Sequence, residues 1–133
     1  MCGRPYVRGR SCEYLLATVF KRGGYVVVRG PASGRGSRTW YPDLTVISGG
    51  KVFFVEVKCF SSRRDIYIPH SRYRKLVWIS EKASVKAYLC VKYGGNSEFR
   101  CVDYMRPSRS TEGYVVFSHR DIEAGSPPTQ LKP

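Results

Sequence analysis

The chain has 133 residues, 42% of them hydrophobic, and its 23 Lys and Arg against 10 Asp and Glu give a net charge of +13. This length suits one compact domain, and the hydrophobic fraction excludes a chain that is disordered throughout. No segment approaches the roughly 18 apolar residues of a membrane span, and no apolar run typical of a signal peptide follows Met1. We therefore expect a soluble cytoplasmic protein, associated with nucleic acid before any anionic membrane surface.

Segments in chain order predict a mixed α/β fold. Residues 1–10 lack periodicity and are interpreted as a basic arm, while Ser11 and Gly23 bound a predicted helix over 12–22. The predicted strands cover residues 25–29, 44–48, 51–58, 66–68, 86–93, 98–104 and 114–118, with loops over 30–41 and 61–65 and a second helix over 69–82. We expect a single domain over 11–122, with a mixed β-sheet flanked by helices, and a disordered tail over 123–133 that is rich in proline.

The charge is unevenly divided between the two halves of the chain. Residues 1–64 carry 12 Lys and Arg against three carboxylates, a net +9, whereas residues 65–133 carry 11 against seven, a net +4. The three carboxylates of the first half are Glu13, Asp43 and Glu56. Because a surface that only binds phosphate gains nothing from acids, these three residues are candidates for a functional site.

A predicted hairpin places two of these acids opposite each other. If Gly49 and Gly50 form a two-residue turn, cross-strand partners have numbers that sum to 99, and Asp43 faces Glu56. Opposed side chains of an antiparallel pair have Cβ atoms about 4.5–5.5 Å apart, where two carboxylates repel. A hard divalent cation removes this repulsion, since Mg²⁺ is held by one or two carboxylates together with phosphate oxygens.

Strand alternation adds a lysine to the same face. Lys58 shares the face of Glu56, and Val57 between them turns to the core. Other interpretations stay open: Asp43 can be a turn acid, Glu56 and Lys58 can belong to a solvated edge strand, and a register slip of one residue would separate the acids.

The cysteines indicate no metal site. They are Cys2, Cys12, Cys59, Cys90 and Cys101. They form no CxxC pair, and His70 and His119 do not complete a zinc-ligand spacing. We interpret them as small core residues, and the question of a disulfide stays open.

The sequence Pro42-Asp43, a spacer of twelve residues and Glu56-Val57-Lys58 resemble the motif of the PD-(D/E)XK nuclease superfamily. With Glu13 on the first helix and a strand and loop over 26–34, the chain is similar to the archaeal-type Holliday junction resolvases over roughly residues 8–95. This resemblance implies a restriction-endonuclease-like nuclease core and a homodimer that cuts four-way DNA junctions symmetrically.

The resemblance also implies a metal site. Asp43 and Glu56 match the family's ligands for Mg²⁺, for which Mn²⁺ is expected to substitute, and the backbone carbonyl of Val57 is the expected third ligand. Glu13 matches an essential acid that reaches the metal through water. As an alternative, Glu13 is a first-turn acid stabilised by the helix dipole.

Further matches concern the attacking water and the DNA. Lys58 matches the lysine that orients the water and stabilises charge on the phosphorane, and Ser33 matches a serine near the scissile phosphate, although it can equally be an ordinary loop serine. The residues expected to bind DNA are Arg8, Arg10, Arg29, Arg35, Arg38, Arg63 and Arg64. Tyr14 departs from the family, which has an arginine there, so either Arg10 substitutes or the DNA is held less tightly at this point.

The sequence thus predicts an Mg²⁺-dependent endonuclease that resolves four-way junctions in recombination and repair and acts on no small-molecule substrate or membrane. One alternative is a related nuclease that cuts duplex or flapped DNA. Another is a non-catalytic basic module that stacks bases on aromatic side chains such as Tyr67 and Trp78. A pair of opposed carboxylates beside a lysine favours the nuclease over the passive module.

Overall fold

The computed structural model describes residues 9–30, 41–94 and 98–133. In chain order the elements are α1 (Gly9–Arg22), β1 (Val26–Arg29), β2 (Leu44–Ser48), β3 (Lys51–Phe60), β4 (Ile66–Pro69), α2 (His70–Ala83), β5 (Lys86–Tyr93), β6 (Arg100–Asp103), β7 (Arg109–Ser110), β8 (Tyr114–Phe117), α3 (His119–Glu123) and the 3₁₀ helix η1 (Pro128–Gln130). The first helix begins at Gly9 and not at residue 12. No proline or glycine follows Gly9 before the apolar residues of the helix, so nothing in the sequence stops the helix from extending back to that residue. Gly9 and Arg10 therefore belong to α1 and not to a separate arm.

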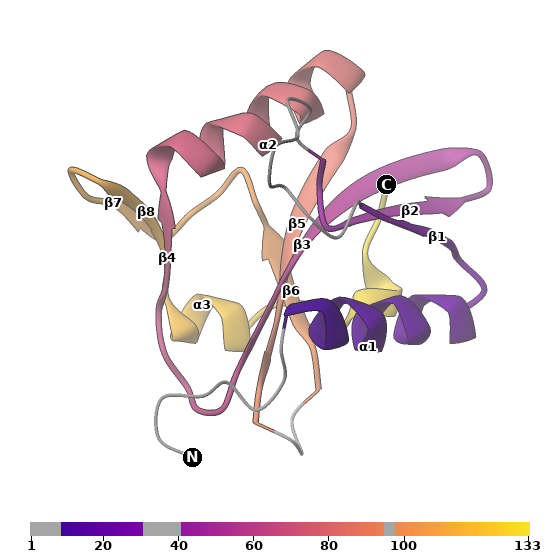
Figure 1. Cartoon of the computed structure of the whole chain (residues 1–133), viewed down its shortest axis with the longest axis horizontal. Coiled ribbons are helices and arrows are strands. Elements are labelled where there is room, and N and C mark those ends of the chain that lie inside the picture. Colours follow the sequence, from indigo (N-terminus) through magenta and orange to yellow (C-terminus); the bar gives the residue numbers. More distant parts are fainter. Residues whose placement is uncertain (1–8, 31–40, 95–97) are drawn as a thin grey trace.

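The strands form two sheets, as Figure 1 shows. The larger sheet has the order β1-β2-β3-β5-β6 and the smaller has the order β4-β8-β7. β3 and β5 run parallel and are joined through β4 and α2, whereas the other neighbouring strands are antiparallel. This is the mixed β-sheet with flanking helices that the sequence predicts.

The hairpin of β2 and β3 has the predicted register. Ser48 pairs with Lys51 and Leu44 with Val55, so each pair sums to 99. The turn residues Gly49 and Gly50 have φ values of 58° and 78°, which a two-residue turn matched to strand twist requires and which glycine adopts without a steric penalty. The local sequence therefore specifies which residue of β2 faces which residue of β3.

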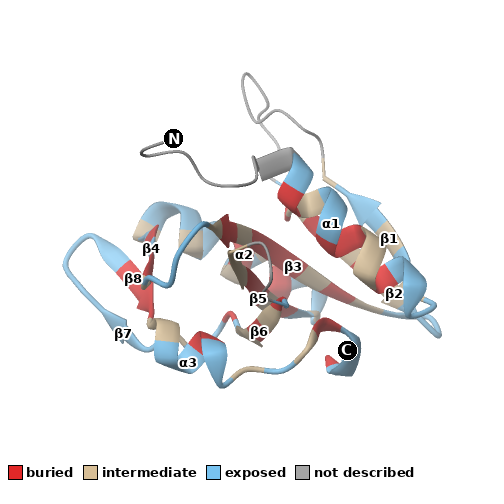
Figure 2. Cartoon of the chain, turned by 90° about the horizontal axis from the view of Figure 1, so that it is seen from below, coloured by how far each residue is buried: buried red, intermediate tan, exposed pale blue. Residues whose placement is uncertain are grey.

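The two faces of β3 pack against different cores. Phe53, Val55 and Val57 belong to a buried cluster with α1, whereas Phe54 and Phe60 pack against a second cluster that contains residues of α2, β4 and β8. Figure 2 shows buried residues gathered along β3 and on the side of α1 that faces it. Because side chains alternate along a strand, Glu56 and Lys58 lie on the α2 side of the sheet.

The C-terminal residues 123–133 were predicted to be disordered, and this prediction is wrong. Ser126 forms a backbone bridge with Cys101, Leu131 is buried, and the Tyr88 hydroxyl donates to the Lys132 carbonyl at 2.6 Å. A Cβ on Gly125 would lie 2.3 Å from the Cys101 carbonyl oxygen, so glycine permits this close approach. Composition favoured disorder, but packing against β6 and α1 orders the segment.

Four cysteines are buried, as predicted, and they also form two disulfides. Cys12 of α1 is bonded to Cys59 of β3, and Cys90 of β5 is bonded to Cys101, its partner on β6. The sequence left these bonds open, because pairing depends on which segments pack together. Within the described part of the chain, no helix is long and apolar enough to cross a membrane.

Candidate active site

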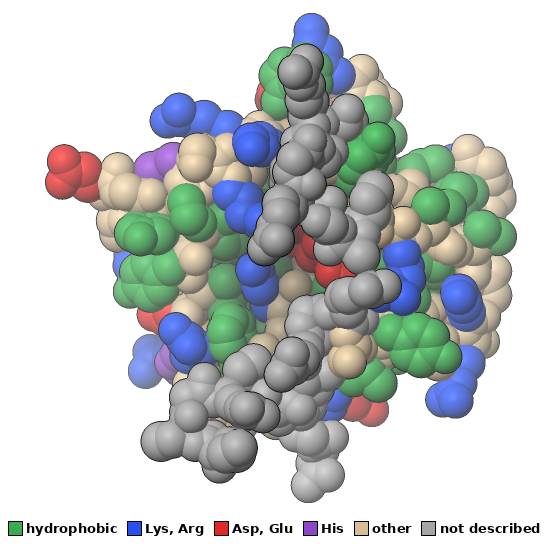
Figure 3. All heavy atoms as spheres, in the orientation of Figure 1, with side chains coloured by type: hydrophobic (Ala, Val, Ile, Leu, Met, Phe, Trp, Pro, Cys, Tyr) green, Lys and Arg blue, Asp and Glu red, His purple; other side chains and the backbone are tan. Residues whose placement is uncertain are grey.

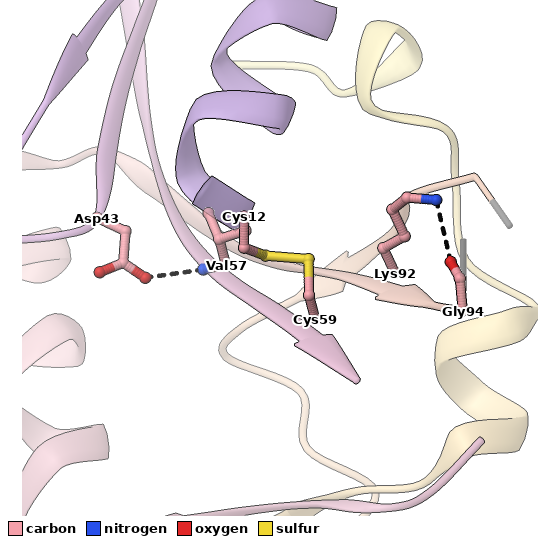
Figure 4. The surroundings of a disulfide bond; sticks show 6 residues. All are labelled: Cys12, Asp43, Val57, Cys59, Lys92 and Gly94. Atoms are coloured by element: carbon pink, nitrogen blue, oxygen red, sulfur yellow. Dashed lines mark hydrogen bonds between the residues drawn. A yellow bond between two sulfur atoms is a disulfide. The ribbon is translucent and has the colours of Figure 1, made fainter. Parts of the chain in front are cut away.

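Asp43 and Glu56 lie side by side at the start of β2, on the α2 side of the sheet. The Asp43 backbone N–H donates to Glu56 Oε1 at 3.2 Å, and the Val57 N–H donates to Asp43 Oδ2 at 2.9 Å. Figure 4 shows this second contact, with the other carboxylate oxygen of Asp43 directed away from Val57. Each acid thus has one oxygen held by the backbone of the opposite strand, which confirms the expected juxtaposition.

Burial makes this pair costly to ionise. Glu56 is only 1% exposed. Desolvation, followed by the charge of the neighbouring Asp43 carboxylate, raises the pKa of Glu56 to about 7. Desolvation also raises the pKa of Asp43, against the hydrogen bond from Val57 and the charges of Arg72 and Lys58. Two adjacent buried carboxylates favour a cation that removes their repulsion.

Lys58 is close enough to act on both acids. Its positive charge lowers the pKa of Asp43 and of Glu56, and alternation along β3 puts its side chain on their face. Val57 turns to the α1 core, as predicted, and is 7% exposed. The face predicted from the hairpin register therefore carries the two acids and the lysine together.

Glu13 is carried by α1, which packs on the face of the sheet opposite to Glu56. The Oε1 of Glu13 is 3.9 Å from Nη2 of Arg29, and Arg29 ends β1 opposite Leu44, the residue after Asp43. The disulfide between Cys12, the residue before Glu13, and Cys59 attaches α1 to β3, as Figure 4 shows for the two cysteines. The structure thus pairs Glu13 with Arg29 near Asp43, and does not group it with the two carboxylates.

The remaining predicted residues are spread more widely. Arg63 forms an ion pair with Glu123 at 3.0 Å, and the guanidinium of Arg64 lies 4.7 Å from the ring centroid of Phe60, both in the segment that follows β3. The other predicted residues, Ser33, Arg8, Arg35, Arg38 and the side chain of Arg10, lie outside the described residues.

Two residues near the carboxylates were missed by the sequence analysis. Arg72, in the first turn of α2, contacts Glu56 Oε2 through Nη2 at 3.3 Å. Tyr104, after β6, is fully buried, and burial and then the Glu56 charge raise the pKa of its hydroxyl. The only sequence signal for Arg72 was its place in the predicted helix over 69–82, and this does not say what that helix faces.

The donor atoms of the site suit a hard divalent cation. No cluster of three or more His, Cys, Asp or Glu side chains occurs in the described segments, and the two carboxylates adjacent at this site are those of Asp43 and Glu56. Carboxylate oxygens are the ligands that Mg²⁺ and Mn²⁺ prefer, and Mg²⁺ commonly needs only one or two carboxylates beside phosphate oxygens and water.

The surface around the site is basic. Figure 3 shows acidic atoms near the centre of one face, with Lys and Arg side chains on several sides of them. Such an arrangement attracts the phosphate backbone of nucleic acid around a small acidic patch.

Comparisons with known proteins show the family to which the chain belongs. The family model described as archaeal Holliday junction resolvase matches residues 4–126. The chain belongs to this family. Two curated relatives are named crossover junction endodeoxyribonuclease Hjc. The protein of Sulfolobus acidocaldarius is 25% identical over 89% of this chain and 81% of its own length, and that of Sulfurisphaera tokodaii is 27% identical over 80% and 72%.

A solved structure shares the fold of this resolvase-family chain. The Holliday junction resolvase Hjc of Archaeoglobus fulgidus superposes with a TM-score of 0.80, at 20% identity, over 92% of this chain and 98% of its own. The mixed sheet with flanking helices is therefore the fold of the family, and its nucleases are in general dependent on divalent metal ions.

Proposed function

We propose that this resolvase-family chain is an endonuclease that resolves four-way DNA junctions by metal-dependent phosphodiester hydrolysis. The observation that supports it most is the opposed, buried pair Asp43 and Glu56 on one face with Lys58, within a chain whose relatives are named crossover junction endodeoxyribonucleases.

The two acids and the Val57 carbonyl would hold Mg²⁺, with Mn²⁺ as a substitute. When bound, such an ion lowers the pKa of water and neutralises phosphate oxygens. Lys58 would place a fixed positive charge where negative charge develops on the phosphorane. In this proposal Glu13 and Ser33 assist at the site, and the arginines hold DNA through phosphates, so that the shape of the junction is recognised.

The active unit is proposed to be a two-fold homodimer. A four-way junction is close to two-fold symmetric, and a dimer would bring two such sites to two opposed strands. In sedimentation equilibrium at micromolar concentration, we expect twice the chain mass of 15.1 kDa. A monomer that stays monomeric on the junction would contradict this part of the proposal.

The decisive experiment compares junction and linear DNA. A labelled immobile four-way junction and a duplex of matched sequence are incubated with the protein in Mg²⁺ and in EDTA. We expect paired symmetric nicks in the junction alone, and none in EDTA. Equal cutting of the duplex would favour a general nuclease, and binding without cutting in any divalent ion would favour a passive module.

Variants assign the cleavage to the carboxylate pair. Asp43→Asn and Glu56→Gln should lower the rate of cleavage by about 10²-fold or more, because each removes a ligand charge, and should leave junction binding in place. Glu112→Gln is the matched control, since Glu112 is exposed. Full activity of Glu56→Gln would exclude this site as the nuclease centre.

A further inference from the structure

Arg72 contacts Oε2 of Glu56, the most buried acid of the site. Its Nη2 lies 3.3 Å from Glu56 Oε2, while Glu56 Oε1 accepts from the Asp43 backbone. The Arg72 side chain is 44% exposed, whereas that of Glu56 is 1% exposed. The guanidinium therefore lies between a buried carboxylate and the solvent from which a metal ion or a phosphate would arrive.

The charge of Arg72 acts on both acids. It lowers the pKa of Glu56 and of Asp43, and in both cases its effect exceeds that of Lys58. A guanidinium keeps its charge at every physiological pH, so this compensation does not depend on protonation of the arginine. Among the described residues, Arg72 is thus the main counter-charge to the pair.

A cation and Arg72 compete for the same oxygens. The Asp43 oxygen not held by Val57 accepts no hydrogen bond from a described residue, and Glu56 Oε2 is held only by Arg72 among these residues. A divalent ion that uses both outward oxygens would repel the guanidinium. Arginine presents five N–H donors in a planar fork that matches a phosphate. The displaced Arg72 guanidinium could therefore bind a phosphate of DNA held at the same site.

We propose that Arg72 is a displaceable counter-ion that holds Glu56 until a divalent cation binds the carboxylate pair, and that the released guanidinium then binds the DNA phosphate at this site. The second half of the proposal rests on the function proposed above. The position of Arg72 at the start of α2 makes both roles possible. Its side chain is partly exposed, so a change of its rotamer alone would move the guanidinium from the Glu56 carboxylate to the solvent side of the site.

The test measures metal affinity without DNA and cleavage separately. Mn²⁺ is titrated by calorimetry at pH 8 into the unchanged protein, Arg72→Gln and Arg72→Lys, and into Arg74→Gln as a matched control. Arg74 is an exposed arginine of the same helix that makes no ion pair with a described residue. The variants are compared for thermal unfolding, and single-turnover junction cleavage is measured at saturating Mn²⁺.

Removal of the competitor should make Arg72→Gln bind Mn²⁺ about three- to tenfold more tightly, and loss of the phosphate contact should slow its cleavage about tenfold or more. Arg72→Lys should restore the weaker Mn²⁺ affinity but only part of the rate, because an ammonium lacks the planar fork. Arg74→Gln should stay within about twofold of the unchanged protein in both measurements.

Two results would overturn the inference. Mn²⁺ affinity of Arg72→Gln equal to or below that of Arg74→Gln would exclude displacement, and equal cleavage rates of these two variants would exclude the phosphate contact. If the unchanged protein binds Mn²⁺ but cuts no junction, the proposed function fails, and the Mn²⁺ comparison still decides whether Arg72 is displaced.

Discussion

Glu56 shows how burial changes the acidity of an ordinary carboxyl group. The side chain lies on a central strand, is 1% exposed, and has a carboxylate neighbour. In water this carboxyl group would be ionised at neutral pH, but here burial, with the Asp43 charge, raises its pKa from 4.5 to about 7. The protein therefore holds a carboxylate that is stabilised by a cation, whether Arg72 or a metal ion.

The raised pKa of Glu56 predicts a pH-dependent stability. Since this pKa is about 7 in the folded protein against 4.5 ordinarily, the folded state binds more protons between these values, and stability falls as pH rises from 4.5 through 7. In EDTA, urea unfolding should show that Glu56→Gln flattens this fall by about 2–3 kcal/mol.

The control for this prediction is Glu112→Gln, because Glu112 is exposed and its removal should leave the pH profile unchanged. Saturating Mg²⁺ should reverse the trend in the unchanged protein, because the ion stabilises the ionised pair. An identical profile for Glu56→Gln and the unchanged protein would show that Glu56 titrates normally.

Tyr104 gives a second prediction at the scale of one residue. Its hydroxyl is buried with no hydrogen-bond partner in the described part of the chain, and its ring stacks on Tyr73 and Phe117 with centroids 4.9 and 5.8 Å away. Tyr104→Phe keeps both stacks and removes an unsatisfied group, so the free energy of unfolding should rise by about 1 kcal/mol.

Tyr88→Phe is the matched comparison for Tyr104→Phe. The Tyr88 hydroxyl donates to the Lys132 carbonyl at 2.6 Å, so its removal should lower the free energy of unfolding by about 1 kcal/mol. Chemical denaturation at pH 7 measures both. If Tyr104→Phe is destabilised as much as Tyr88→Phe, the Tyr104 hydroxyl has a partner after all.

At the scale of elements, the attachment of α1 to β3 matters for the site. The disulfide Cys12–Cys59 closes a separation of 47 residues, and its cysteines neighbour Glu13 and Lys58 in the sequence. α1 also packs on the β3 face opposite Glu56. The bond thus restrains two elements that carry proposed site residues.

The two disulfides should differ in their effect on stability. The bond Cys90–Cys101 closes only 11 residues, and a longer loop loses more entropy in the unfolded chain when it is cross-linked. The double variant Cys12→Ala/Cys59→Ala should lower the free energy of unfolding by about 4 kcal/mol, and Cys90→Ala/Cys101→Ala by about 3 kcal/mol. Urea unfolding without reductant measures both, and the reverse order would contradict the loop-entropy account.

At the scale of the whole molecule, the net charge of +13 dominates. Only a few of these cations are neutralised by ion pairs on the described surface, such as Arg63 with Glu123 and Arg109 with Asp65. The excess is available to nucleic acid, whose phosphates release counter-ions when Lys and Arg bind them.

Junction affinity should therefore depend steeply on salt. If about six to ten phosphates are contacted, the dissociation constant measured in EDTA should rise about 10³- to 10⁵-fold between 50 and 200 mM KCl. Arg63→Gln should reduce the slope less than Arg64→Gln, because Arg63 is already paired with Glu123 at 3.0 Å, whereas the exposed Arg64 forms no ion pair with a described residue. Affinity that is independent of salt would contradict recognition through phosphates.

Local sequence was sufficient to predict the face that carries the proposed catalytic residues. Period-two alternation defined β2 and β3, and two glycines able to adopt positive φ set the register. These are interactions between neighbours in the chain, so Asp43 opposite Glu56, with Lys58 beside them, could be predicted before the fold was known.

Only the tertiary structure decided what surrounds that face. It brought Arg72 to Glu56, paired Glu13 with Arg29, paired the cysteines and ordered the residues after Gly125. Apart from the Cys90–Cys101 bond between adjacent strands, these contacts depend on how the helices and the C-terminal segment pack against the sheet when the two cores are buried. Hydrophobic burial has no direction, so a sequence pattern shows which side of a helix is buried but not which residue it will meet.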